Sequence, residues 1–351
     1  DQLLNAARSH KTDKIDEATF EEIKNKAIAD IVSFQDSIGM PSVTDGEFRR
    51  RVWSGGVSDA LVGMSIKDSG TLTFKSDEGD VLMPPSPYAE GKLRRRHNIV
   101  TDDFKFVKSL KPKGHPKVTM ASPPVMHFFL GRDSYNPEVY DSNEAYFADL
   151  TKAYQEEIVE LAAAGCTYIQ LDDTALPCNC DLDARKTIIA RGEDPDELTD
   201  IYVKAINSAV SNRPSNMFAG MHMCRGNLKG LWMAEGGYEP IADQIFNELN
   251  IDAFFLEYDN ERSGDFEPLR YLPVGKVAVL GIVSTKTPEL EDKDGLKRRI
   301  DEASKFVPLE QLAISPQCGF SSGGGGGQVV THDDTRRKLE LVLEVANDVW
   351  G

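Results

Sequence analysis

The sequence is poor in cysteine, has no long apolar run and carries too little positive charge to balance its acidic residues. Five cysteines spread over 351 residues do not form the disulfide framework of a small secreted protein, and this favours free thiols or metal ligands. No apolar run approaches the ~18 residues that a membrane span needs, and no basic-then-apolar signal peptide opens the chain. We therefore expect a cytoplasmic protein that does not act at a membrane.

The deficit of positive charge also excludes a class of partner. The chain has 40 Lys and Arg against 57 Asp and Glu, a formal net charge of −17. Such a surface repels phosphate backbones, so nucleic acid is not an expected partner. With 40% hydrophobic and 28% charged residues, the composition is that of a globular protein and not of a disordered chain.

Glycine fingerprints of the G-x-G-x-x-G type are missing as well, which argues against a dinucleotide-binding fold. What the sequence does show is an alternation of short β-branched apolar runs with longer helical patterns, typical of β/α units on a parallel sheet. The predicted strands are residues 42–44, 117–122, 167–172, 217–224, 251–258, 276–285 and 311–315. The predicted helices are residues 16–38, 143–164, 199–211, 238–249, 293–306 and 335–349.

These repeats predict an α/β fold of the (β/α)8 TIM-barrel type, formed as one catalytic barrel over residues 1–351. The chain opens on a pattern that indicates a helix, Asp1-Gln2-Leu3-Leu4, so we expect the first of the eight strands to be missing or replaced. Residues 54–115 are too long for an ordinary connection and predict a hairpin-like excursion over the barrel mouth. The five glycines of 323–327 predict a mobile loop or an engineered replacement.

Chemistry-bearing side chains gather where the predicted strands end, which is the active face of a β/α barrel. His222 and Cys224 lie two residues apart on one strand and therefore point to the same side. Glu257 ends the next strand, and Cys318 follows the last one. Thiolates and imidazole favour zinc over magnesium or calcium, so these four residues predict a Zn2+ site. Individually, Cys318 also fits a small buried hydrophobe, and Glu257 also fits an ion pair with Arg262.

Five segments carry a family resemblance in their order and spacing. They are T-D-G-E-F-R-R (44–50), I-Q-L-D-D (169–173), H-M-C-R-G-N (222–227), L-E-Y-D (256–259) and S-P-Q-C-G-F (315–320). The chain resembles the cobalamin-independent methionine synthase family over essentially its whole length, and is most similar to the short, single-barrel members. The resemblance implies zinc-dependent methyl transfer to homocysteine, giving methionine.

The resemblance also implies roles for single residues. The zinc ligands of the family fall on His222, Cys224, Glu257 and Cys318. The two acidic residues that hold the amino group of homocysteine fall on Glu47 and Asp172, whose other interpretation is a helix cap or an ion pair with Arg49 or Arg50. A carboxylate pair facing one ammonium is physically sensible because charge-assisted hydrogen bonds are strong.

The sequence departs from the family pattern at three places. Lys286 stands where methionine synthases carry a histidine that assists proton delivery to the leaving group; a lysine can donate a proton or bind an anion, and a surface lysine is the alternative. Residues 121–124 replace an Asn-Trp-Ser of the folate face, with His127 and its neighbours lining the pocket or the core. The upstream Gly-Ser strand that contacts the amino-acid carboxylate is not visible.

These departures leave alternatives open. Epoxyalkane:coenzyme M transferases are similar and alkylate a sulfonated thiol, for which Lys286 or Arg49 would bind the anion. Retention of Glu47 and Asp172 favours an amino-acid thiol. A metal-free relative, similar to uroporphyrinogen decarboxylases, is the further alternative.

The predicted partners are a small-molecule thiol and a methyl donor, which is a folate, a corrinoid protein or another methylated metabolite; homo-oligomerisation stays open. The pair Cys178 and Cys180 favours loop packing over a second metal or a redox pair. For the basic run 94–96, a solvated face or ion pairing is favoured over an anion clamp.

Overall fold

We describe the protein from a computed structural model, which covers residues 2–68, 73–75, 81–82, 85–228, 231–321 and 329–351. The glycine run 323–327 lies outside the described residues. Helix α1, Gln2–Lys11, confirms the helix predicted at the start of the chain. Within the described ranges, no helix is long and apolar enough to cross a membrane.

A six-stranded parallel sheet forms the centre, in the order β12-β11-β10-β9-β8-β7. Its strands are β7 (Val118–Ala121), β8 (Tyr168–Asp173), β9 (Phe218–Met223), β10 (Ala253–Glu257), β11 (Val277–Val283) and β12 (Leu312–Pro316). Strand β1 (Ser42–Val43) pairs in parallel with β6 (His115–Pro116), which immediately precedes β7. The row of strands thus continues through β7 and β6 to β1, and every predicted strand is present.

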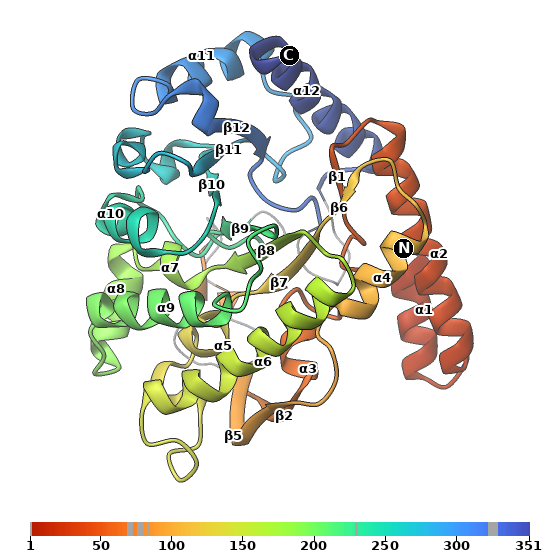
Figure 1. Cartoon of the computed structure of the whole chain (residues 1–351), viewed down its shortest axis with the longest axis vertical. Helices are drawn as coiled ribbons and strands as arrows, with labels where there is room; N and C mark the ends of the chain where they lie inside the picture. Colours follow the sequence, from red (N-terminus) through yellow and green to blue (C-terminus); the bar gives the residue numbers. More distant parts are fainter. Residues whose placement is uncertain (1, 69–72, 76–80, 83–84, 229–230, 322–328) are drawn as a thin grey trace.

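Helices cover the outside of this row, and Figure 1 shows the strands following one another around a common centre. The longer helices are α2 (Glu17–Ser37), α4 (Thr101–Ser109), α6 (Asn143–Ala163), α8 (Leu182–Ala190), α9 (Pro195–Ala209), α10 (Glu239–Glu248), α11 (Lys293–Ala303) and α12 (His332–Trp350). Short helices are α3 (Gly55–Asp59), α5 (Val125–Phe128) and α7 (Ala175–Cys178), with 3-10 turns at Gly131–Ser134, Glu261–Ser263, Glu267–Tyr271 and Leu309–Gln311.

Side-chain caps set where the helices begin. Asp16 accepts a hydrogen bond from Thr19 N at 2.8 Å and starts α2, and Asp194 caps α9 just before Pro195. Thr331 and Asp334 form a reciprocal capping box at α12. Because these polar residues precede the apolar pattern, the predicted starts of α9 and α12 lie a few residues too late in the chain.

The predicted barrel is confirmed as a row of parallel strands with helices outside it. Strands β12 and β1 are the two edges of the row, and no backbone pairing joins them in the described part of the chain. The structure therefore shows an α/β fold with a parallel sheet, and closure of the row into a barrel stays a prediction.

The segment from 54 to 115 contains an antiparallel hairpin, as the sequence predicted. Strands β2 (Leu61–Lys67) and β5 (Ser86–Arg95) pair along most of their length, and β3 (Thr73–Phe74) pairs with β4 (Val81–Leu82). Near its far end, Lys75 N donates to Trp232 O at 2.7 Å and Lys75 Nζ lies 2.8 Å from Asp181 Oδ2. Both partners follow carboxyl ends of central strands, so the hairpin reaches over that face. Helix α4, in contrast, packs between α2 and α6 and belongs to the β/α alternation.

His127 and its neighbours lie in the core and not in a pocket. The His127 side chain is buried; Tyr202 Oη lies 2.9 Å from its Nδ1 and Asn143 Oδ1 lies 3.0 Å from its Nε2. Burial lowers the pKa of His127 to about 3, and the hydrogen bond to Asn143 acts against this shift.

We predict that His127 makes the fold acid-sensitive. In the unfolded chain His127 binds a proton below a pKa of about 6.5, whereas in the folded chain it stays neutral down to pH about 3. The free energy of unfolding therefore falls as the pH falls through this range. His127→Gln should remove about 2 kcal/mol of the loss between pH 6.5 and 5, measured by urea unfolding. The exposed His97→Gln is the control, and identical slopes for wild type and His127→Gln would refute the prediction.

Candidate functional site

Four potential metal ligands converge at the carboxyl ends of three strands. His222 lies on β9 and Cys224 directly after it, Glu257 ends β10, and Cys318 follows β12. One ligand atom from each residue lies within 4.8 Å of all the others. His222 Nε2 is 3.3 Å from Glu257 Oε1, and the sulfurs of Cys224 and Cys318 are 3.9 Å apart. The structure thus brings together all four residues that the sequence singled out.

The ionisable groups of this site shift in different directions. Burial acts to lower the pKa of His222 but its carboxylate neighbours raise it, and the hydrogen bond to Cys318 together with burial raises the pKa of Cys224. The hydrogen bond from Cys224 lowers the pKa of Cys318, and the charges of His222 and Lys286 act in the same direction. Burial opposes the charge of Glu257, but the hydrogen bond to His222 and the charge of Lys286 lower its pKa overall. Cys318 and Glu257 are therefore the two members of the group whose pKa shifts favour the deprotonated, metal-binding form.

A layer of residues that the sequence did not identify holds Glu257 in place. The backbone N–H of Arg225 donates to Glu257 Oε2 at 3.2 Å, and the N–H of Glu257 donates to Tyr238 Oη at 3.0 Å. The Arg225 guanidinium lies over the Tyr238 ring, 4.3 Å from its centre. Arg225 sits inside the H-M-C-R-G-N segment, so its position in sequence was the only available signal.

An acidic pocket adjoins the metal group. Glu47 adopts a left-handed φ of 60°, a conformation that costs a non-glycine residue about 1 kcal/mol or more. Its Oε1 accepts a hydrogen bond from Thr119 Oγ1 at 2.8 Å and lies 3.2 Å from Arg50 NH1. Burial raises the pKa of Glu47; Arg50 opposes this rise, and the nearby charge of Asp172 adds to it. Asp172 Oδ1 in turn lies 3.6 Å from His222 Nδ1.

The two carboxylates are therefore neighbours of each other and of the metal group. The Glu47 side chain is 34% exposed, and its Oε1 is engaged by Arg50 and Thr119. Asp173, which the sequence analysis passed over, is buried, and burial raises its pKa to about 6. Its carbonyl accepts the N–H of Cys224 at 2.7 Å, which fixes the start of the ligand loop.

Comparison with known proteins agrees with the family resemblance that the five sequence segments carry. Residues 2–347 match the family model of the cobalamin-independent synthase catalytic domain. The chain belongs to this family. It is 39% identical to the uncharacterised Bacillus subtilis protein YxjH (94% of this chain, 86% of the relative) and 27% identical to the methionine synthase of Pyrococcus abyssi (90% and 82%). A solved Listeria monocytogenes structure, described as a candidate vitamin-B12-independent methionine synthase, superimposes with a TM-score of 0.78 at 34% identity, covering 99% of this chain and 94% of that one.

Within this cobalamin-independent synthase domain, Lys286 is buried and is not a surface lysine. Its side chain is 9% exposed and its Nζ lies 3.4 Å from Asp259 Oδ2, which is itself buried. The charge of Lys286 is one of several that act to lower the pKa of Glu257 and that of Cys318. The lysine therefore stands beside the metal group.

Arg49 lies elsewhere. Its guanidinium contacts Glu21 at 2.7 Å, Asp103 at 3.0 Å and Asn25 at 2.5 Å, all on helices α2 and α4. Adjacent residues of the loop after β1 point apart, so Arg50 and not Arg49 reaches the acidic pocket. Arg49 is therefore not among the residues that we propose to bind the substrate.

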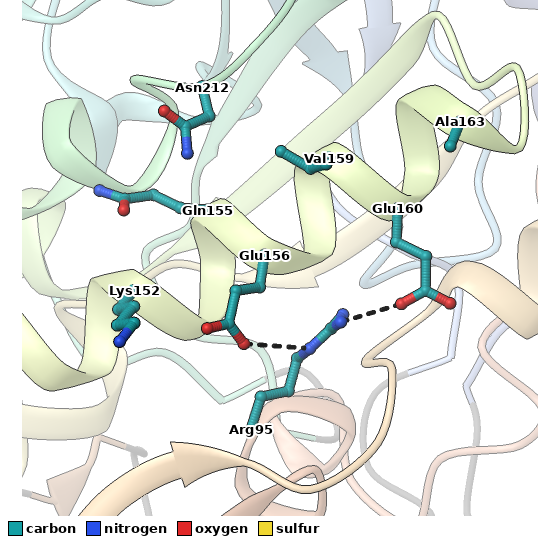
Figure 2. Close-up of a pocket in the computed structure, with 8 residues that line it drawn as sticks. All are labelled: Arg95, Lys152, Gln155, Glu156, Val159, Glu160, Ala163 and Asn212. Atoms are coloured by element: carbon teal, nitrogen blue, oxygen red, sulfur yellow. Dashed lines mark ion pairs between the residues drawn. The ribbon is translucent and has the colours of Figure 1, made fainter.

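The other candidate groups of the sequence have structural partners. Arg262 stacks on Trp232, 4.0 Å from its ring centre, and Cys178 and Cys180 are buried free thiols. Arg95 of the basic run pairs with Glu156 and Glu160 along α6, beside an open surface hollow of about 580 Å³ (Figure 2). None of the residues that line this hollow is a metal ligand or a member of the acidic pocket.

Removing a single thiol should disable metal binding. We predict that Cys318→Ser weakens Co2+ and Zn2+ binding by more than about 100-fold, beyond the 10–100-fold typical of residues that only support a ligand. The readout is the thiolate-to-cobalt absorption band and chelator competition. Cys180→Ser removes a buried thiol outside the group and should bind metal as wild type does. Equal affinities for the two variants would remove Cys318 from the ligand set.

Proposed function

We propose that this protein is a zinc-dependent methyltransferase that methylates the thiol of homocysteine to give methionine. The observation that carries the proposal is the convergence of four ligand atoms, two pairs of which have the spacing of a zinc site. A tetrahedral zinc ion with Zn–S of about 2.3 Å and Zn–N or Zn–O of about 2.1 Å requires an S–S separation of ~3.8 Å and an N–O separation of ~3.4 Å. The structure has 3.9 Å between Cys224 and Cys318, and 3.3 Å between His222 and Glu257.

The donor set supports zinc over harder cations. Two thiols and an imidazole outnumber the one carboxylate, whereas magnesium and calcium prefer oxygen ligands. Zinc in such a site lowers the pKa of a substrate thiol and, with thiolate co-ligands, keeps its sulfur nucleophilic. The residues around the site would bind the substrate and transfer its proton.

The acidic pocket supports an amino-acid thiol as the acceptor. In the proposal, Glu47 and Asp172 bind the substrate ammonium through charge-assisted hydrogen bonds. Asp172 lies beside the metal ligand His222, so an ammonium held there brings the rest of a short amino acid close to the metal group. A sulfonated thiol such as coenzyme M gains nothing from two carboxylates. Of the two cations considered for it, Arg49 is engaged on helices α2 and α4 and Lys286 is paired with Asp259.

The reaction balances without another redox partner. The sulfur of homocysteine forms a bond to the methyl carbon, while the bond between that carbon and its carrier breaks and leaves its electron pair on the carrier. The proton lost by the thiol compensates the charge of the leaving carrier. We assign proton delivery to Lys286, whose side chain is buried and pairs with Asp259. Relatives named methionine synthase support the proposal at the level of the family.

Zinc-loaded protein should methylate L-homocysteine with at least one donor from a panel of methylfolates of different glutamate length, methylcobalamin and other methylated metabolites. Glu47→Gln should raise the KM for homocysteine about 10-fold or more, because one charge-assisted hydrogen bond is lost, and should leave zinc content unchanged. The readouts are methionine formation and metal analysis.

Competition separates the alternatives. If coenzyme M but not L-homocysteine changes the thiolate-to-cobalt absorption band of the cobalt-substituted protein, homocysteine is not the methyl acceptor. If reconstituted protein holds far less than about one zinc per chain, the metal-dependent mechanism is wrong and the metal-free alternative gains.

A further inference from the structure

A chain of polar contacts crosses the inside of the sheet and ends on the metal ligand His222. Lys117 Nζ, just before β7, donates to Gln170 Oε1 on β8 at 2.9 Å. Gln170 Nε2 donates to Asp172 Oδ1 at 2.6 Å, and this same oxygen lies 3.6 Å from His222 Nδ1 on β9. Asp172 and His222 are direct partners in the parallel register of β8 and β9. The chain thus links three neighbouring strands.

The chemistry of the groups determines which atom donates in each hydrogen bond of this series of contacts. A lysine ammonium can only donate hydrogen bonds, so the Gln170 amide must turn its carbonyl toward Lys117. Its NH2 group then faces Asp172 and donates to Oδ1. Without Lys117 the Gln170 carbonyl loses its donor, and the amide is held by the Asp172 carboxylate alone. Lys117 therefore anchors the end of the chain of contacts that lies farthest from His222.

Asp172 in turn determines how His222 presents its ring. With a metal bound, a carboxylate facing Nδ1 would stabilise the tautomer with the proton on Nδ1 and leave the Nε2 lone pair for the metal. Nε2 lies 3.3 Å from Glu257 Oε1 and 3.1 Å from the carbonyl oxygen of Gln317, the residue before Cys318. Both contacts of Asp172 in this chain use Oδ1, so we assign Oδ2 to the substrate ammonium.

Lys117 occupies a costly position for a cation. Its Nζ lies 5.0 Å from the ring centre of Phe255 and 5.2 Å from that of Tyr168. Burial lowers its pKa to about 8, although Asp172 and Glu47 both act to raise it. A buried ammonium needs compensation by nearby groups, and the groups that supply it here are those of the acidic pocket.

We propose that Lys117 and Gln170 are positioning residues that hold Asp172 against His222 and thereby orient the metal ligand. Asp172 would then serve two purposes, since one oxygen orients the metal ligand while the other binds the substrate ammonium. The inference rests on the metal site of the proposed function and adds to it two residues that lie outside the ligand set.

The test is the zinc dissociation constant of Lys117→Met and Gln170→Met, measured by chelator competition, together with the absorption spectrum of the cobalt-substituted proteins. Loss of a group that orients a metal-binding histidine should weaken zinc binding about 10–100-fold and alter the cobalt bands. Lys276→Met is the matched control. Lys276 is another partly buried lysine, bound to the carbonyls of Phe246 and Leu249 at 2.7 and 2.6 Å at the amino end of β11, and its loss should leave the zinc affinity at the wild-type value.

Two results overturn the inference. If wild type binds zinc and both Lys117→Met and Gln170→Met bind it equally well, the positioning role is wrong and the proposed function stands. If wild type itself takes up no zinc, the proposed function fails and the inference fails with it. Should Lys117→Met not fold, as judged by circular dichroism, Gln170→Met decides alone, because it is nearly isosteric and removes no charge.

Discussion

The chemistry of this protein depends on one geometric constraint: parallel strands end at the same edge, so residues far apart in sequence meet there. Cys224 and Cys318 come within 3.9 Å of each other because β9 to β12 are consecutive in the sheet. The hydrogen-bonded registers fix the heights of the strands, and the period of two sends His222 inward while Met221 and Met223 pack into the core. His222 and Glu257 lie on strands β9 and β10, and Cys224 and Cys318 follow the ends of β9 and β12 by one and two residues, so the strand ends fix where all four ligands lie.

A second constraint is charge. The chain carries a net charge of −17, yet its pocket alternates signs: Glu47 with Arg50, Asp172 with Lys117 through Gln170, and Asp259 with Lys286. Isolated carboxylates at this depth would take up protons, whereas neighbouring cations favour the ionised form. In the proposed reaction, an anionic methyl donor would meet local cations at such places, against an unfavourable overall field.

Much of this was readable from the sequence, and the limits have physical causes. Strands and ligand positions followed from apolar runs and their ends, and the order of five motifs identified the family. The start of α9 was missed because Asp194 and Pro195 are a cap and not part of the apolar pattern. Arg49 and Arg50 could not be told apart, because the left-handed turn at Glu47 decides which one faces inward. Lys117 and Gln170 are polar residues at or beside strands, and only the fold shows that they meet. Ring closure depends on backbone pairing between β12 and β1, which no local pattern encodes.

The central claim is that His222, Cys224, Glu257 and Cys318 hold one zinc ion at which the thiol of homocysteine binds. X-ray absorption at the zinc edge tests this most directly. The account predicts two sulfur neighbours at about 2.3 Å and two nitrogen or oxygen neighbours at about 2.0–2.2 Å in the protein alone, and a third sulfur after addition of L-homocysteine. An absorption spectrum that shows no sulfur neighbours, or a sulfur count that homocysteine does not change, would contradict it.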